Sequence, residues 1–156
     1  MKALVHALIE WPRDVARHIT WLGPLFARIV TGWVFLWTGW GKLTHLPLVI
    51  QNFEGWGIPA PELLAPFASG AEFVCGILLL AGLMTRIAAG ALAIVMIVAI
   101  DAVTGPEVAS LLGFLGLEET MYLALFLWLA IAGAGPVSLD AALERRAPHA
   151  VGAPHA

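Results

Sequence analysis

Charged residues are scarce in this sequence, and their scarcity decides its class. Asp, Glu, Lys and Arg make up 12% of the 156 residues, whereas 60% are hydrophobic. So few charges cannot cover the surface of a water-soluble domain. The mean hydropathy of +0.88 leads to the same class, an integral membrane protein with the lipid bilayer as its first partner. The net charge of −3, without a cluster of Lys and Arg, argues against nucleic acid as a partner.

Cysteine is nearly absent, and the motifs of self-contained enzymes are missing. The single cysteine, Cys75, excludes an internal disulfide, a CxxC redox pair and a cysteine metal cage. None of the five histidines lies well inside an apolar stretch or has ligand spacing on a helix, so we expect no metal and no tightly bound cofactor. Nucleophile motifs, phosphate loops and dinucleotide fingerprints are also missing. Membrane quinone is the cofactor that the sequence leaves open.

Four apolar stretches have about the 20 residues that a helix needs to cross a membrane. They cover residues 22–42, 64–83, 87–105 and 115–134, and Pro and Gly punctuate the connections between them. Helices are the expected form, because each backbone amide in lipid must find a partner within its own segment. The sequence therefore predicts an all-α fold in which residues 21–140 form a bundle of four transmembrane helices.

The two ends of the chain are predicted to lie outside this bundle. Within residues 1–20, the segment 2–18 is predicted to be an amphipathic helix on the membrane surface, with a disordered tail as the alternative. Residues 141–156 are predicted to be a cytoplasmic tail that is disordered beyond Arg146.

The basic residues predict the orientation, because loops that hold Lys and Arg stay in the cytoplasm. With four spans, only Lys42 falls on the outer side. The inner side receives Lys2, Arg13, Arg17, Arg86, Arg145 and Arg146. We therefore expect a multi-pass protein with both termini in the cytoplasm.

Each predicted helix combines a charge with small residues on one face, at about 100° per residue. In the first helix, Arg28, Gly32, Phe35, Gly39 and Lys42 share a face, opposite Trp33, Trp37 and Trp40. The corresponding faces of the other helices are Ala65, Ala68, Ser69, Glu72, Cys75, Gly76 and Leu79; Gly90, Ile94, Ile97, Asp101 and Gly105; and Glu119, Leu123, Phe126, Ala130 and Gly133. Small residues allow close helix packing in lipid, so these faces are expected to form the interior.

Two groups of charges follow as candidate sites. Arg28 and Glu72 are the candidate catalytic residues and are expected to pair, because an isolated charge at mid-membrane costs at least about 2.5–3.5 kcal/mol. The second group, near the outer surface, is the candidate site for a substrate or partner and comprises Lys42, His45, Asp101 and Glu119. For both groups a purely structural role stays open, because buried ion pairs can also fix helix register.

Several segments occur in an informative order. Arg28 and Gly32 precede FLWTGWGKL, which is followed by NFEGWGIPAP, AEFVCGILLLAGLMTRIAA and finally GAGPVSLDAAL. In this order they resemble the DoxX family of small bacterial membrane proteins, over residues 27–143. The resemblance implies a four-helix protein of the bacterial inner membrane, with a polar signature at Arg28, Lys42, Glu72, Arg86 and Asp140. The sequence departs from the family at the Asp101-Ala-Val-Thr-Gly end of the third helix and in its apolar third connection.

The resemblance also implies an association with redox complexes, without fixing a reaction. Relatives include DoxD-like subunits of thiosulfate:quinone oxidoreductase and proteins that accompany membrane oxidoreductases in thiol and oxidative stress. We therefore hypothesise a membrane subunit that links a sulfur or thiol donor on a partner protein to membrane quinone, with a homo-oligomer as another possible assembly. The alternatives are a non-catalytic anchor or assembly protein for soluble partners, and a transporter of a small molecule or proton.

Overall fold

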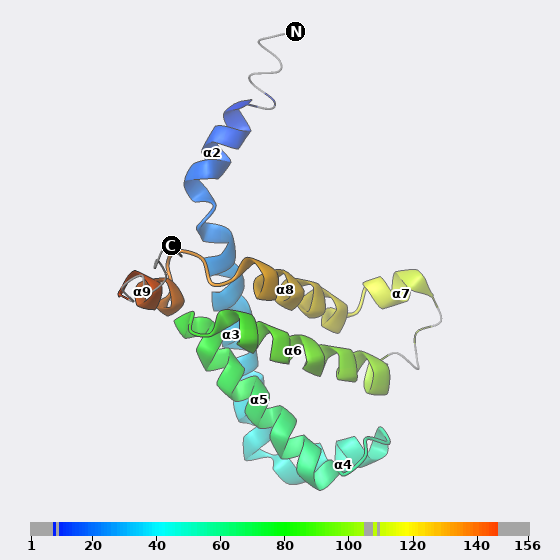
Figure 1. The fold of residues 1–156 in the computed structure, drawn as a ribbon. Coiled ribbons are helices and arrows are strands. Elements are labelled where there is room, and N and C mark those ends of the chain that lie inside the picture. Colours follow the sequence, from blue (N-terminus) through cyan, green and yellow to red (C-terminus); the bar gives the residue numbers. More distant parts are fainter. Residues whose placement is uncertain (1–7, 9, 105–107, 109, 147–156) are drawn as a thin grey trace, which may run out of the picture.

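The computed structural model of the protein describes residues 8, 10–104, 108 and 110–146, and these residues are mostly helical with no strand among them (Figure 1). The elements in chain order are α2 (Trp11–Ile19), α3 (Leu22–Thr44), α4 (Leu46–Gly55), α5 (Pro61–Ala81), α6 (Thr85–Ala99), the π-helix η2 (Ile100–Thr104), α7 (Leu111–Leu115), α8 (Glu118–Ala132) and α9 (Leu139–Arg146). The predicted all-α fold is confirmed.

The long helices pack as two antiparallel pairs. Helix α3 lies along α5, and α6 lies along α8, while α5 contacts α6 and α3 contacts α8. The two pairs diverge toward the ends that carry α4 and α7 (Figure 1). Apolar side chains from all four helices meet between the pairs, among them Phe35, Leu79, Leu92, Phe126 and Leu129. The rings of Phe35 and Phe126 make an edge-to-face contact with centroids 5.0 Å apart.

Two of these helical segments are individually long and apolar enough to cross a membrane. They are Pro61–Ala81 and Thr85–Val103, and α2 together with α3 makes a third if this pair, bent by 52°, counts as one span. Helix α8 has 15 residues, which corresponds to about 22 Å at 1.5 Å per residue, less than the roughly 30 Å of a hydrocarbon core. The membrane class is thus confirmed, and the count of four spans stays a prediction.

The predicted interior faces are confirmed for α3 and α5 and wrong for α6. Helix α3 buries Arg28, Gly32, Phe35 and Gly39, and the three predicted lipid-facing tryptophans are more than half exposed. Helix α6 instead buries its alanine-rich face, which comprises Thr85, Ala88, Ala89, Leu92, Ala93 and Met96. The prediction failed because it placed Asp101 inside. Asp101 is exposed and lies in η2, where the helical period changes.

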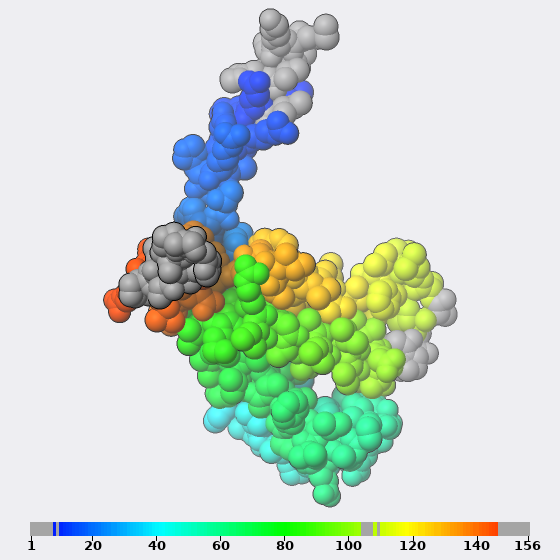
Figure 2. Space-filling view, in the orientation of Figure 1, coloured from blue at the N-terminus to red at the C-terminus, as the bar shows by residue number. Residues whose placement is uncertain are grey.

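Both ends of the chain carry a helix outside the packed pairs. Helix α2 has no buried residue and projects from the rest of the molecule (Figures 1 and 2). Within the segment 2–18, a helix is therefore observed from Trp11, and its place on the membrane surface stays a prediction. Residues 1–7 and 9 lie outside the described residues. At the other end α9 continues to Arg146, so order extends past residue 141, where the tail was expected to begin. Residues 147–156 lie outside the described residues.

The first connection contains a helix that the sequence analysis did not predict. Helix α4 begins beside Pro47 and buries Val49 against α5. Proline is well tolerated in the first turn of a helix, because its missing N–H has no intrahelical acceptor there. Pro47 was interpreted as a breaker, and it starts a helix instead.

Candidate functional site

One polar cluster lies where residues 133–146, named here the C-terminal clasp, fold back onto the turn between α5 and α6. Asp140 accepts hydrogen bonds from the backbone N–H groups of Met84 (2.7 Å) and Thr85 (3.1 Å). Its own N–H donates to the carbonyl of Gly82 at 2.9 Å. A carboxylate is favourable at the start of a helix, where N–H groups lack intrahelical partners. Asp140 therefore serves as the N-terminal cap of α6 from a distant part of the chain.

Two arginines lie beside the clasp, and both donate to backbone carbonyls. Arg28 is 1% exposed, and its Nη2 donates to the carbonyl of Val137 at 2.8 Å. Arg86 Nη1 donates to the carbonyls of Ile131 (2.6 Å) and Ala130 (3.2 Å) at the end of α8. A cation is favoured there, because the last carbonyls of a helix have no intrahelical donor. Among the described side chains, Nε and Nη1 of Arg28 are buried without a hydrogen-bond partner.

Gly82 makes room for the Arg28 guanidinium. A Cβ atom at Gly82 would collide with Nη1 of Arg28 and would lie 2.7 Å from Cβ of Ser138. Gly82 also has φ +64°, a left-handed conformation that favours glycine after a helix. The α5–α6 turn thus requires glycine here both for its backbone conformation and for its contact with Arg28.

The second polar cluster is an ion pair between α3 and α5. Lys42 Nζ lies 2.6 Å from Oε1 of Glu72. The Glu72 side chain is 3% exposed, whereas that of Lys42 is 43% exposed, so the ammonium connects a buried carboxylate to the surface. Oε2 of Glu72 is buried and has no hydrogen-bond partner among the described residues.

The predicted pair between Arg28 and Glu72 is wrong, because Glu72 bonds to Lys42 and Arg28 bonds to the clasp. The reason is the direction in which helical side chains lean. Each Cα–Cβ bond tilts toward the N-terminus of its helix. Lys42, near the C-terminal end of α3, leans into the molecule, whereas Arg28, near the start of α3, leans outward. Glu72 on the antiparallel α5 leans toward the end that carries Lys42.

Glycines bring α3 and α5 close enough for this pair. A Cβ atom at Gly39 would collide with the backbone nitrogen of Phe73 and lie 2.8 Å from its Cα atom. A Cβ atom at Gly76 would lie 2.5 Å from the backbone nitrogen of Leu36. These are backbone contacts, so neither helix can yield by moving a side chain. The approach of the backbones sets the spacing across which Lys42 reaches Glu72.

The remaining predicted site residues do not gather around Lys42. His45 is exposed, and its Nδ1 lies 2.9 Å from the carbonyl of Gly41. Asp101 is exposed in η2, and Glu119 is half-buried in the first turn of α8. In the described part of the chain, no ion pair joins His45, Asp101 or Glu119 to Lys42. The same part of the chain holds no group of three His, Cys, Asp or Glu side chains with metal-binding geometry.

The Lys42–Glu72 pairing is the feature that the sequence analysis missed. Both residues were named as candidates, but they were assigned to separate groups according to their depth along each helix. The signal that predicts the pair is the combination of antiparallel helices with side-chain tilt, which brings the end of one helix toward the middle of its neighbour. A count of residues from the membrane surface omits that tilt.

Helices that are long and apolar enough to cross a membrane, with no strand among the described residues, define an all-helical integral membrane protein. The DoxX family model matches residues 23–105, a range that contains α3 except for its first residue and the whole of α4, α5 and α6. The chain belongs to the DoxX family. It is similar to the uncharacterized membrane protein Rv3486 of Mycobacterium tuberculosis, with 38% identity over an alignment of length 154. The match covers 88% of this chain and 91% of the relative. No solved structure matches the chain.

Proposed function

We propose that this protein is the membrane subunit of an oxidoreductase, in which Lys42 and Glu72 bind the headgroup of a membrane quinone. The observation that supports this proposal most is the buried Glu72 carboxylate, which has one oxygen bonded to Lys42 and the other free of hydrogen bonds in the described structure. A buried polar atom normally has a partner. The free oxygen therefore marks a place where a ligand or a proton completes the site.

The chemistry of quinone reduction matches these two side chains. A quinone takes up two electrons and two protons, so its site needs a donor for the carbonyl oxygen and a group that can pass protons. The half-exposed Lys42 ammonium is suited to the first role. The Glu72 carboxylate, which can accept and release a proton, is suited to the second. Trp40 and Phe73, with ring centroids 5.7 Å apart, offer an aromatic surface one or two residues away on the same helices.

The electrons have to come from a partner protein. Oxidation of two thiols to a disulfide releases two electrons and two protons, which balances the reduction of one quinone. This chain has one cysteine, and Cys75 is buried in the core. We therefore propose that a sulfur or thiol donor is held by a second protein, and that this chain supplies the quinone site.

We further propose that the protein is a multi-pass protein of the inner membrane with both termini in the cytoplasm. Support comes from the arginines, all six of which belong to α2, the first part of α3, the start of α6 and α9. Antiparallel packing brings these segments to one end of the long helices, and Lys42 belongs to the other end. A membrane-impermeant thiol reagent tests the orientation. A cysteine introduced at exposed Arg146 should react only in inverted vesicles, and reaction only in right-side-out vesicles would reverse the assignment.

The quinone proposal is tested in membrane vesicles from the source cells, where the native partner is present. Vesicles with the chain should reduce a short-chain quinone with a dithiol donor faster than vesicles from a deletion strain. Glu72→Gln should lower this rate at least about tenfold, because an amide cannot relay a proton at the same position. Photo-crosslinking with an azido-quinone should label peptides of α3 or α5, and labelling should fall in Glu72→Gln.

The matched control is Glu62→Gln, which makes the same change at an exposed residue in the first turn of α5. It should keep the full rate and the full labelling. An unchanged rate in a Glu72→Gln protein that is present at normal levels would contradict the proposed function.

A non-catalytic anchor is the second candidate, and α2 is the observation that favours it. Every residue of α2 is exposed, and the helix projects from the packed pairs (Figure 2). Such a helix can dock a soluble partner on the membrane. Under this alternative, deletion of residues 1–19 abolishes co-purification of the partner, while Glu72→Gln changes neither co-purification nor any quinone reaction.

A further inference from the structure

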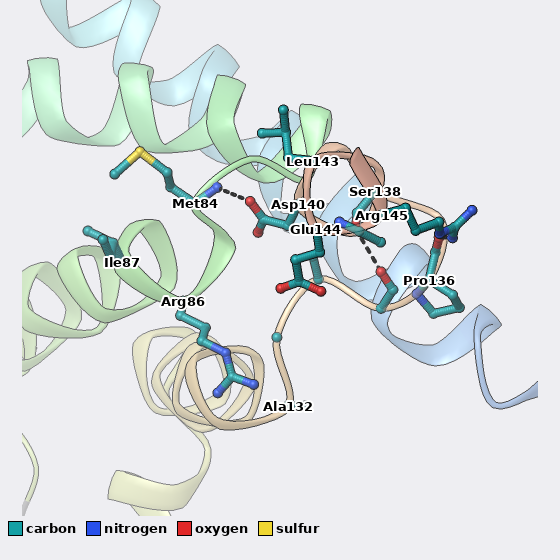
Figure 3. Close-up of a pocket in the computed structure, with 14 residues that line it drawn as sticks. Met84, Arg86, Ile87, Ala132, Pro136, Ser138, Asp140, Leu143, Glu144 and Arg145 are labelled. Atoms are coloured by element: carbon teal, nitrogen blue, oxygen red, sulfur yellow. Dashed lines mark hydrogen bonds between the residues drawn. The ribbon is translucent and has the colours of Figure 1, made fainter. Parts of the chain in front are cut away.

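The clasp encloses one side of a cavity of about 900 Å³ that is far from the Lys42–Glu72 pair along α3 and α5. Its wall comes from the first turn of α6, the end of α8 and helix α9, and Figure 3 shows the side chains that line it. Its volume falls in the usual range for small-molecule sites, roughly 300–1,000 Å³. The cavity is therefore large enough to receive a polar headgroup.

Three charged groups that line this cavity have bonding capacity left after the clasp has formed, namely Arg86, Glu144 and Arg145, whose Nη2 donates to the carbonyl of Pro136. Arg86 uses Nη1 for the carbonyls of α8, which leaves Nη2 and Nε as further donors. Glu144 on α9 is exposed and takes part in no hydrogen bond or ion pair among the described residues. Asp140, by contrast, has both carboxylate oxygens bonded to backbone N–H groups. Figure 3 shows the Glu144 carboxylate on the side of α9 that faces Arg86. The cavity thus offers further guanidinium donors on Arg86 and, on Glu144, a carboxylate without a hydrogen-bond partner among the described residues.

The cavity also lies at the boundary between polar and apolar surroundings. Met84 and Arg86 belong to the turn and first residues of Thr85–Val103, one of the segments long and apolar enough to span a membrane. Three apolar side chains of the lining are at least half exposed, namely Met84 (50%), Ile87 (65%) and Leu143 (56%). Exposed apolar groups beside charges at the end of a span are typical of the region where acyl chains meet headgroups.

We propose that this cavity binds the headgroup of a phosphatidylethanolamine molecule, a lipid that carries one phosphate and one primary ammonium. Arg86 binds the phosphate, since guanidinium donors match phosphate oxygens. Glu144 accepts hydrogen bonds from the ammonium, while Met84, Ile87 and Leu143 contact the upper part of the acyl chains. A choline headgroup has no N–H to donate, and a glycerol headgroup has no positive charge. The site therefore distinguishes ethanolamine lipids from both.

The test measures lipid retention by the whole purified protein with native mass spectrometry. Phosphatidylethanolamine, phosphatidylcholine and phosphatidylglycerol with identical acyl chains are added to delipidated protein at equal concentration. We expect phosphatidylethanolamine to bind about tenfold more tightly than phosphatidylcholine, the scale of one hydrogen bond between charged groups. Glu144→Gln should remove most of this preference, because the amide carries no charge. Glu118→Gln, an exposed change at the start of α8, should keep it.

Three results would overturn the proposal. Equal binding of the ethanolamine and choline lipids to the unmodified protein would remove the ammonium contact. A full ethanolamine preference in Glu144→Gln would exclude Glu144 as the acceptor. Complete displacement of the lipid by an equal concentration of soluble phosphoethanolamine would show that the acyl chains contribute nothing and that the ligand is a free small molecule. Glu144 is exposed, so the Glu144→Gln protein is expected to fold, and its thermal unfolding is measured alongside.

Discussion

The C-terminal clasp and the Lys42–Glu72 pair both contain charged side chains, but they use these charges differently. At the clasp, Asp140 bonds to two backbone N–H groups, and the neighbouring Arg28 and Arg86 bond to backbone carbonyls. In the pair, two charged side chains bond to each other, and one carboxylate oxygen has no hydrogen-bond partner among the described residues. Backbone N–H and carbonyl groups stay uncharged at any working pH, whereas a carboxylate and an ammonium can exchange a proton.

The difference separates the scaffold from the candidate chemistry. Asp140 bonds to the start of α6, and Arg86 joins α6 to the end of α8. These contacts between helix ends account for the two charges without any chemical reaction. The pair lies between α3 and α5 and leaves Glu72 buried beside a half-exposed cation. We therefore expect substitutions of Asp140, Arg28 and Arg86 to act mainly on stability. Substitutions of the charges in the pair are expected to act mainly on function.

The largest expected effect on stability comes from the contact that holds the pair in place. Gly39→Ala would force α3 away from the backbone of Phe73, and overpacking of this kind costs about 3 kcal/mol of unfolding free energy. Because Cys75 is the sole cysteine and is 8% exposed, its reaction with a thiol-reactive dye during heating reports unfolding. The matched control is Gly41→Ala, where a new Cβ meets no atom within 4 Å. Equal unfolding temperatures for the two variants would show that α3 and α5 are not in close contact.

Removal of the Asp140 carboxylate is expected to have the next largest effect on stability. Asp140→Ala takes away both acceptors from the amides of Met84 and Thr85 and lowers the unfolding free energy by about 2 kcal/mol. Asp140→Asn keeps one acceptor and should lose about half as much. The same Cys75 assay measures both. If Asp140→Ala unfolds like the unmodified protein yet abolishes quinone reduction, the assignment of the clasp to the scaffold is wrong.

Loss of the cation of the pair should have a smaller effect on stability. Lys42→Met leaves the Glu72 carboxylate buried without its partner, which strongly destabilises fully buried pairs. Because Lys42 is 43% exposed, solvent screening reduces the expected cost to about 1 kcal/mol. The double variant Lys42→Met/Glu72→Gln should recover most of this loss, and the coupling is obtained from a double-mutant cycle. Strictly additive effects would mean that the two side chains do not interact.

The sequence was sufficient to predict the class, the long helices and two of the interior faces. Sparse charge and apolar length predicted a helical membrane protein, and glycines opposite tryptophans predicted the inner face of α3. The face of α6 was wrong because a charge at the end of a helix was taken to mark its interior, and Asp101 lies in η2 instead. The Arg28–Glu72 pair was wrong because depth was counted without side-chain tilt. The hydrogen bonds of Arg28 and Arg86 to backbone carbonyls could not be predicted from residue types, since any residue can supply a carbonyl.

The central claim is that Glu72, and not Arg28 or Asp140, meets the quinone. Infrared difference spectroscopy of the reconstituted protein, recorded with and without a short-chain quinone, observes carboxyl groups directly. We predict a change in the carboxyl region on quinone binding that is lost in Glu72→Gln and kept in Asp140→Asn. A change that persists in Glu72→Gln, or one that disappears only in Asp140→Asn, would contradict the account.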